Sequence, residues 1–267
     1  NGVTSVGQAT AGSDGSYSVT ISALSDGSYS LTAKATDSAG NASADSSALS
    51  ILIDTVVPAA PTISGTSPTN DETPSLSGTA EAGTVVTVYD GNTTLGQAIA
   101  DAGGTFSFVP GTLSEGGHTI TATTSDSAGN VSSSSDSLSL VIDLTPPTIT
   151  LTGADVTVPH SGSYSDPGVT AQDAVDGTVT VSTSHAVDPS SVGTYVVTYS
   201  AIDTAGNSST ANRTVNVTDQ TVPVITLSGD ASVTVEAATS YLDAGASASD
   251  VVDGNITGTM VTVNPIS

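Results

Sequence analysis

The chain has 267 residues, of which 26 are acidic and only two, Lys34 and Arg213, are basic, so its formal net charge at pH 7 is -24. This charge excludes the basic surface that nucleic acid or an anionic membrane requires. The chain has no Cys and no Trp, which excludes disulfides and thiolate metal sites and leaves oxygen-ligated cations as a source of extra stability. It also has no apolar run long enough to span a bilayer, and its first residues lack the features of a signal peptide. We therefore expect no nucleic-acid partner and no direct membrane insertion.

Two internal repeats divide the chain. The first part matches a later segment without a gap at an offset of 89 residues, which places Asp37 on Asp126. A different pair of segments matches at an offset of 77 residues, which places Asp173 on Asp250. The repeats predict four units of two kinds, with the first and last units incomplete, as in a section of a longer array. The predicted units are 1–53, 54–142, 143–218 and 219–267.

Short segments of alternating polar and apolar residues lie between Gly, Asn and Asp turns. In the unit 54–142 the predicted strands are 61–66, 74–80, 84–90, 94–100, 104–109, 118–126 and 138–143. In the next unit they include 178–184, 194–203 and 211–219. Alternation with frequent turns and no helical period predicts an all-β chain of tandem immunoglobulin-like β-sandwich domains, without the Cys and Trp of antibody domains.

Each unit ends in an apolar strand that is followed by an acid and then by proline, as in "ILIDTVVPAAP", "LVIDLTPP" and "VNVTDQTVP". Proline excludes helix there and stiffens the connection. The linkers are too short to act as flexible tethers. We therefore expect a semi-rigid, elongated array in which the partners of each repeat are its neighbours.

The phrase "DSAGN" occurs at 37–41 and at 126–130, and "DTAGN" occurs at 203–207. Because strands of a seven-strand sandwich alternate in direction, the linker and the second, fourth and sixth connections share one end. For the unit that begins at residue 54, this end is expected to collect Asp54, Glu81, Asp101, Asp126 and Asn130. Its four carboxylates form six like-charged pairs, each costing about 1 kcal/mol in water at 4 Å and about 4 kcal/mol at an effective dielectric constant of 20.

The second kind of unit has its own version of this acidic end. The expected members are Asp143, Asp173, Asp176, Asp203 and Asn207, and at the following linker Asp219, Asp250 and Asp253. Ca²⁺ accepts six to eight oxygen ligands of these types, whereas Zn²⁺ prefers His or thiolate. The alternative is that these acids are ordinary turn residues that bond their own backbone. Their convergence at one end of each domain favours Ca²⁺.

Several of these segments resemble bacterial Ig-like (BIg) tandem repeats of giant secreted or surface adhesins: "GTAEAGTVVTVYDG", "ADAGGTFSF", "DSAGN" and "IDTVVPAAP". The segments "DPGVTAQDAVDG" and "GTYVVTYSAIDTAGN" resemble a related Ig-like repeat of bacterial surface proteins. The resemblance implies extender domains with Ca²⁺ at their joints, an extracellular or cell-surface location, and a host or environmental ligand bound by another region. It assigns Ca²⁺ ligands to Asp54, Glu81, Asp101 and Asp126.

The three histidines, His118, His160 and His185, are scattered and form no catalytic arrangement with the acids, so we expect no enzyme activity. His118 takes the place of Tyr29 in the sister repeat and is expected on a strand face. A structural extender is the main hypothesis. The alternatives are a glycan- or protein-binding Ig-like module and the accessory domains of a secreted enzyme.

Overall fold

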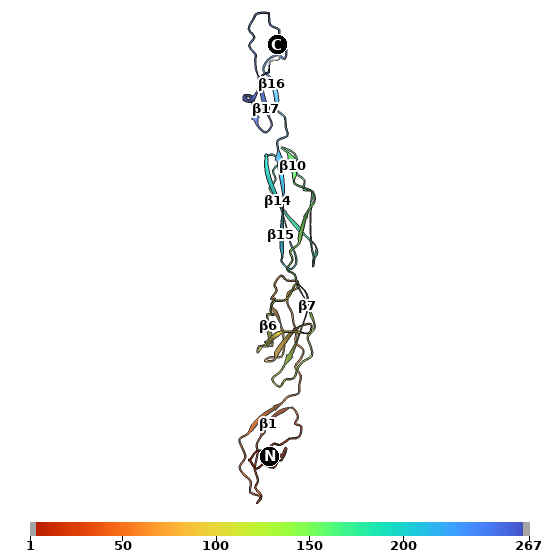
Figure 1. Cartoon of the computed structure of the whole chain (residues 1–267), viewed down its shortest axis with the longest axis vertical. Helices are drawn as coiled ribbons and strands as arrows, with labels where there is room; N and C mark the ends of the chain where they lie inside the picture. Colours follow the sequence, from red (N-terminus) through yellow and green to blue (C-terminus); the bar gives the residue numbers. More distant parts are fainter. Residues whose placement is uncertain (1–3, 264–267) are drawn as a thin grey trace. The chain divides into compact units, whose positions relative to one another are not determined.

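The computed structural model describes residues 4–263, whose regular secondary structure is almost entirely β-strand (Figure 1). The chain forms two compact units that divide between Ile142 and Asp143. The one helix in the described part is a single 3₁₀ turn, η1 (Thr257–Thr259). No helix within 4–263 has the length and apolar character needed to cross a membrane. The prediction of an all-β chain is confirmed.

The first unit contains a hairpin-like pair and a sandwich. Strand β1 (Gly27–Leu31) pairs antiparallel with β2 (Leu49–Ile53). The sandwich has a two-stranded sheet, β3-β6, and a four-stranded sheet in the order β5-β4-β7-β8. Its strands are β3 (Leu76–Thr79), β4 (Val85–Asp90), β5 (Thr93–Ile99), β6 (Thr105–Phe108), β7 (Gly116–Ser125) and β8 (Leu138–Ile142).

Alternation along the strands explains which residues form this core. Strand β7 buries Ile120, Ala122 and Thr124 and leaves the residues between them partly exposed. Strand β4 does the same with Val86 and Val88. Burial of apolar surface is the main contribution to stability here, because each fully buried Val or Ile side chain contributes roughly 1.5–3 kcal/mol.

The segment 61–66 differs from its prediction as a strand. It makes an isolated bridge between Ser64 and Ser77 and one further backbone bond, from the Thr62 N–H to the Thr79 carbonyl at 2.8 Å. Nearby, the N–H group of Thr79 donates to the side-chain oxygen of Thr62 at 2.9 Å, where a ladder would use a backbone carbonyl. A threonine hydroxyl therefore takes the place of a backbone partner, and the regular ladder is interrupted.

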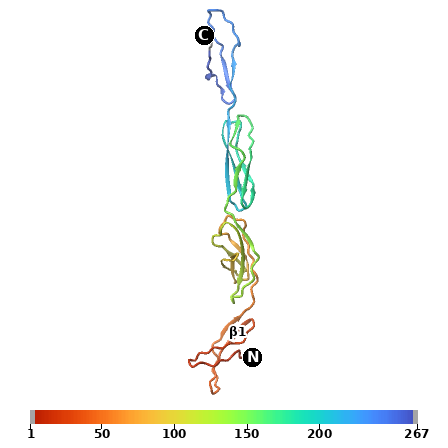
Figure 2. The same ribbon diagram turned by 45° about the vertical axis from the view of Figure 1, so that its right-hand side comes forward.

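The second unit contains a sandwich in which β10 runs parallel to β15 at the edge of a four-stranded sheet, β10-β15-β14-β13. The facing sheet has the order β12-β11-β9. Figure 1 shows β14 and β15 side by side, and Figure 2 gives the turned view of the same layers. The strands are β9 (Thr148–Leu151), β10 (Val156–Pro159), β11 (Val169–Asp173), β12 (Gly177–Val179), β13 (Val181–Ser184), β14 (Gly193–Ile202) and β15 (Ser208–Thr218).

The core of this sandwich encloses one cation, the guanidinium of Arg213, whose side chain is 0% exposed. It donates to Tyr199 Oη at 3.0 Å and to the carbonyl oxygens of Ala154 and Gly168 at 2.6 and 3.0 Å. The Tyr199 hydroxyl in turn donates to Asp166 at 2.9 Å. A buried charge requires such complete hydrogen bonding, so Arg213 acts as a structural link between loops and core.

The described residues after Asp219 form a small three-stranded sheet, β16-β17-β18. Its strands are β16 (Val224–Leu227), β17 (Ala246–Asp250) and β18 (Gly254–Asn255). Strand β17 alternates in burial and places Ala248 and Asp250 on its inner side. A buried aspartate at the end of a strand is a position where a binding partner is expected.

Candidate metal centres

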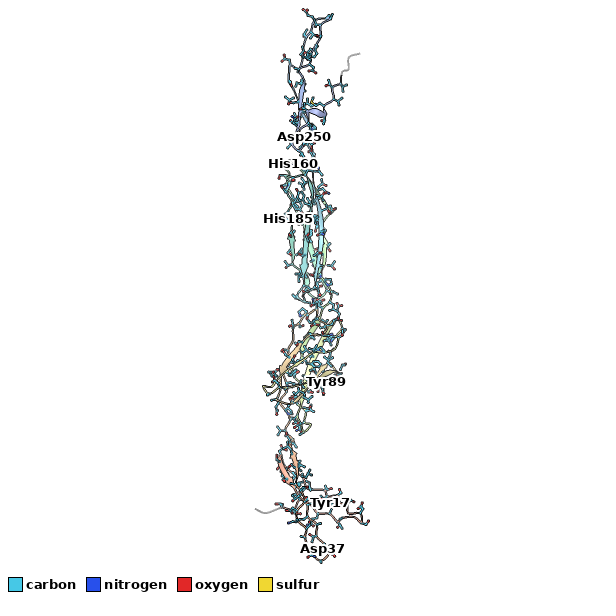
Figure 3. All side chains as sticks on the ribbon, turned by 90° about the vertical axis from the view of Figure 1, so that its left-hand side faces the viewer. Tyr17, Asp37, Tyr89, His160, His185 and Asp250 are labelled. Carbon is cyan, nitrogen blue, oxygen red and sulfur yellow. The ribbon has the colours of Figure 1, made fainter. Side chains whose placement is uncertain are left out.

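The three copies of the Asp-x-Ala-Gly-Asn phrase form the same turn. In the copy at 126–130, Asp126 Oδ1 accepts the N–H groups of Ala128 and Asn130, each at 2.9 Å. The Asn130 side chain donates through Nδ2 to Asp126 Oδ2 at 2.8 Å. The copies that begin at Asp37, labelled in Figure 3, and at Asp203 repeat the bond between the two side chains at 2.9 and 3.0 Å. Both carboxylate oxygens therefore hold the turn together.

Glycine is required inside this turn. Gly40, Gly129 and Gly206 have φ values of 90°, 92° and 96°, in the left-handed region that residues with a Cβ rarely adopt. At Gly40 and Gly129 an added Cβ would meet no atom within 4 Å. The requirement at these two positions is therefore one of backbone conformation and not of space.

In two of the copies the asparagine also holds the preceding linker. Asn130 Nδ2 donates to the carbonyl oxygen of Asp54 at 3.0 Å. Asn207 Nδ2 donates to the carbonyl oxygen of Asp143 at 2.8 Å. The sequence predicted these asparagines as metal ligands, and the structure shows them as donors that tie a linker to the last turn of the domain that follows it.

The four acids predicted around the Asp54 linker fall into separate local arrangements. Asp101 accepts bonds from the main chain and hydroxyl of Thr105, both at 2.8 Å. The turns that carry Glu81 and Asp101 are joined by backbone bonds, including Ala80 N–H to the Gly104 carbonyl at 2.9 Å. Within residues 4–263, however, Asp54, Glu81, Asp101 and Asp126 do not form a group of three carboxylates within 4.8 Å of one another. The Asp54 linker site remains a prediction.

The linker at Asp143 is different. Asp143, Asp173 and Asp203 each present a carboxylate oxygen, and the three oxygens lie within 4.8 Å of one another. Asp143 opens the domain, Asp173 ends β11, and Asp203 follows β14. These three residues, named here the Asp143 triad, thus come from three separate segments of one domain.

The Asp143 triad contains a buried oxygen without a partner. Asp143 is 0% exposed, and its Oδ2 atom has no hydrogen-bond partner among the described residues. Its Oδ1 atom is bonded to the N–H and hydroxyl of Thr145 at 3.2 and 3.0 Å. A buried carboxylate oxygen that faces two other carboxylates is costly unless a positive charge satisfies it. The all-oxygen ligand set fits Ca²⁺, and the structure itself contains no His or Cys in this group.

Asp176 does not belong to the Asp143 triad, although the sequence predicted it there. Its carboxylate accepts the N–H of Thr204 at 2.6 Å and the Thr204 hydroxyl at 2.5 Å. Its own N–H donates to Asp173 Oδ1 at 3.0 Å. Asp176 therefore bonds to Asp173 through its N–H group and to Thr204, the residue after Asp203, through its carboxylate.

A second group forms at the next linker. Asp219, Asp250 and Asp253 also present oxygens within 4.8 Å of one another, but only Asp250 is buried. The hydroxyl of Thr221 donates to Asp219 Oδ1 at 2.6 Å and lies 3.0 Å from Asp250 Oδ2. We name these three acids the Asp219 triad. Its carboxylates are more exposed, and a hydroxyl already satisfies part of their bonding.

Local hydrogen bonds keep several of these acids ionised. The side-chain bond from Asn130 lowers the pKa of Asp126, and the backbone bond from Asp176 lowers the pKa of Asp173. The backbone bond from Val252 lowers the pKa of Asp250. Since hydrogen bonds to a carboxylate favour its charged form, these groups stay ionised to a lower pH than a free aspartate does.

Sequence reasoning missed the threonines of these sites. Thr145 and Thr221 follow the linker acids by two residues and bond to them, and Thr204 follows Asp203 and bonds to Asp176. The recurring pattern Asp-x-Thr at 143 and 219 was a signal for the first two. In a chain so rich in threonine, that pattern does not stand out.

The comparisons with known proteins identify two kinds of domain. A family model described as a bacterial Ig-like domain matches residues 1–55 and 58–144. A second, described as a bacterial surface protein Ig-like domain, matches residues 149–217. A curated relative, an uncharacterized 81.3 kDa protein of Acholeplasma phage L2, is 37% identical over 83 residues, which cover 29% of this chain and 11% of that protein. The chain thus matches only about a tenth of that relative's length.

Solved structures with similarity to the chain include a BSP domain of a biofilm associated protein, at 29% identity over 53% of this chain and 23% of that one, with a TM-score of 0.29. A tetra-tandem repeat from the extending region of a large adhesion protein is 26% identical over 83% and 65% of the two chains, with a TM-score of 0.30. A Ca²⁺-stabilized adhesin of an Antarctic bacterium is 19% identical over 72% and 57%, with a TM-score of 0.36.

The family matches confirm the predicted resemblance to both kinds of bacterial Ig-like repeat. They also confirm the immunoglobulin-like class of the sandwiches. Because the first model alone covers more than half of the sequence, the chain belongs to the bacterial Ig-like domain family.

Proposed function

We propose that this chain is a structural extender section of a bacterial surface or secreted adhesin, and that Ca²⁺ fixes its linkers to the domains that follow them. The observation that carries the proposal is the buried, unpartnered Oδ2 atom of Asp143 beside two other carboxylates. Such an arrangement destabilises the fold unless a cation compensates the charge. The chain would then serve to extend the adhesin and to keep it rigid, and it would not catalyse a reaction.

The residues of the Asp143 triad would hold the ion. Ca²⁺ would supply the positive charge that the three carboxylates lack and would satisfy the free oxygen of Asp143. The protein contributes the positions of the ligands: Asn207 fixes the Asp143 carbonyl, and Thr145 orients its carboxylate. The linker would thereby be fastened to the domain at two points, one through hydrogen bonds and one through the ion.

The Asp219 triad would form a second and weaker site. Two of its three carboxylates are exposed, so their mutual repulsion is screened by water and salt, and less free energy is gained when an ion neutralises them. A surface or extracellular location is part of the same proposal, because residues 149–217 match a family model described as a bacterial surface protein Ig-like domain. Ca²⁺ sites of extracellular modules bind in about the 10⁻⁴–10⁻³ M range.

Calcium binding and small-angle scattering test this function on the whole chain. Isothermal titration of chelated protein should show saturable Ca²⁺ binding, and scattering should show a broader distribution of dimensions in EDTA than in Ca²⁺. Titration with Mg²⁺ should give weaker binding, because Mg²⁺ demands a stricter octahedral geometry. Absence of Ca²⁺ binding, or scattering curves that coincide with and without EDTA, would refute the proposal.

A further inference from the structure

We propose that Asp176 is a positioning residue that braces the Asp143 triad through Thr204 and does not itself bind the ion. The inference rests on the proposed function and assigns a role within that same site. The sequence placed Asp176 among the ligands, on an equal footing with Asp173 and Asp203. The structure separates it from them, because the oxygens of Asp143, Asp173 and Asp203 lie within 4.8 Å of one another and Asp176 is not in that group.

The brace consists of a short chain of hydrogen bonds between two turns. Asp173 Oδ1 accepts the N–H groups of Val175 and Asp176 at 2.7 and 3.0 Å, which shapes the turn between β11 and β12. That turn presents the Asp176 carboxylate to Thr204. One oxygen accepts the Thr204 N–H at 2.6 Å and the other accepts its hydroxyl at 2.5 Å. Both oxygens of Asp176 are thus used by the residue next to Asp203.

The two turns belong to different layers of the sandwich. The turn of Asp173 and Asp176 connects β11 and β12 of the three-stranded sheet, and the turn of Asp203 and Thr204 connects β14 and β15 of the four-stranded sheet. Two carboxylates on separate layers repel each other and would move apart unless they were restrained. The Asp176–Thr204 bonds restrain them. Outer partners of this kind typically change metal affinity by 10- to 100-fold when they are removed.

The chain itself contains a contrast. At an offset of 77 residues, Asp253 corresponds to Asp176, yet Asp253 is one of the three acids of the Asp219 triad. Asp176 and Asp253 differ in the contacts of their carboxylate oxygens. Beside the Asp143 triad, Thr204 occupies both oxygens of Asp176.

Four variants of the full chain test the brace: Asp176→Ala, Thr204→Val, their double variant, and Thr204→Ser. Ca²⁺ affinity is measured by isothermal titration. Asp176→Ala, which removes both bonds, should weaken the site about tenfold. Thr204→Val, which removes the hydroxyl bond and keeps the N–H bond, should weaken it by a smaller factor. The double variant should be no weaker than Asp176→Ala, because Asp176→Ala already breaks the whole connection. Thr204→Val leaves every charge in place, and Thr204→Ser, which keeps the hydroxyl, should bind like the wild type.

Asp188→Ala is the matched control for loss of one negative charge. The Asp188 carboxylate accepts the N–H and hydroxyl of the nearby Ser190, and Asp188 precedes β14, at the end of that strand opposite Asp203. Its substitution should leave the affinity unchanged. A tenfold loss in Asp176→Ala with wild-type affinity in Thr204→Val would overturn the inference, because Asp176 would then act as a ligand.

A readout without metal separates this inference from the proposed function. In chelated protein, hydrogen exchange of the Thr204 amide should be slow and should accelerate in Asp176→Ala, because its acceptor is lost. A wild-type protein that binds no Ca²⁺ overturns the proposed function and the positioning role with it, even if this amide is protected. A wild-type protein that binds Ca²⁺ while its Thr204 amide exchanges freely overturns the brace alone.

Discussion

At the scale of single residues, the β1–β2 pair and the two sandwiches share a feature in which an aromatic side chain bonds back to the carbonyl four residues earlier. Tyr29 and Tyr195 donate through their hydroxyls to the carbonyls of Ser25 and Ser191, each at 2.9 Å. This is the geometry of a tyrosine corner, which is typical of immunoglobulin-like domains. In the domain between them a histidine, His118, takes this role.

His118 makes the corner sensitive to pH. Its Nε2 lies 2.8 Å from the Ser114 carbonyl oxygen and its Nδ1 lies 2.7 Å from Asp90 Oδ2. Both partners are acceptors, so only the imidazolium, which carries two N–H groups, donates to both. The bond to the Ser114 carbonyl and, after it, the bond to Asp90 raise the pKa of His118 above its ordinary value.

A raised pKa in the folded state fixes the direction of the pH effect. The stabilisation by His118 is fully present below its unfolded pKa of about 6.5 and is lost as the pH rises through the higher folded value. The variant His118→Tyr, which restores the residue of the sister repeat, should remove this dependence. Urea unfolding of both proteins between pH 5.5 and 8.5 measures it; parallel stability curves would contradict the assignment.

At the scale of elements, the five-residue turn acts as a latch between a linker and the end of a domain. Asn130→Ala and Asn207→Ala each remove the bond to a linker carbonyl in addition to the bond within the turn. Each should cost about 1 kcal/mol more in the free energy of unfolding than a loss of the turn bond alone, since a typical hydrogen bond contributes about that amount.

Asn41→Ala is the matched control for the latch. Asn41 makes the same side-chain bond within its turn, to Asp37 at 2.9 Å, and among the described residues it bonds to no linker carbonyl. Urea unfolding monitored by hydrogen exchange resolves the effect near each turn. Equal losses in all three variants would show that the asparagine serves only its own turn.

The sequence predicted the elements better than the contacts of the side chains at their ends. Alternation located β7, β14 and β15, since burial of every second residue requires that pattern. Strand direction predicted which end of the domain would collect Asp143, Asp173 and Asp203. Strand direction could not predict that Asp176 bonds to Thr204, because the direction in which a side chain of a turn points depends on the turn's own hydrogen bonds.

At the scale of the whole molecule, the negative charge is confined to turns and linkers. Within the described strands an acid occurs only as the last residue, as Asp90 in β4, Asp173 in β11 and Asp250 in β17. The long strands β14 and β15 carry none. A chain with a net charge of -24 thus keeps acidic side chains out of its strands except at their last residues, and it concentrates repulsion at the ends of domains, where a bound cation would relieve it.

This arrangement predicts that one substitution raises or lowers the unfolding temperature depending on whether Ca²⁺ is present. In EDTA, Asp143→Asn should unfold at a higher temperature than the wild type, because it removes an uncompensated buried charge. In Ca²⁺ the order should reverse, since binding to the native state stabilises the wild type by about 2.7 kcal/mol when the free ion is at 100 times the dissociation constant. Differential scanning calorimetry of both proteins, in EDTA and in Ca²⁺, measures which of them unfolds at the higher temperature in each condition.

Sodium chloride distinguishes this buried site from general charge repulsion. Salt screens exposed carboxylates but screens a fully buried one much less, so 0.5 M NaCl, roughly three times physiological strength, should restore little of the stability that EDTA removes from the wild type. Asp188→Asn, an exposed acid in a local turn, should keep the wild-type response to both ions. If Asp143→Asn responded to Ca²⁺ as strongly as the wild type does, the stabilising ion would bind elsewhere, and the linker at Asp143 would be held by Asn207 and Thr145 alone.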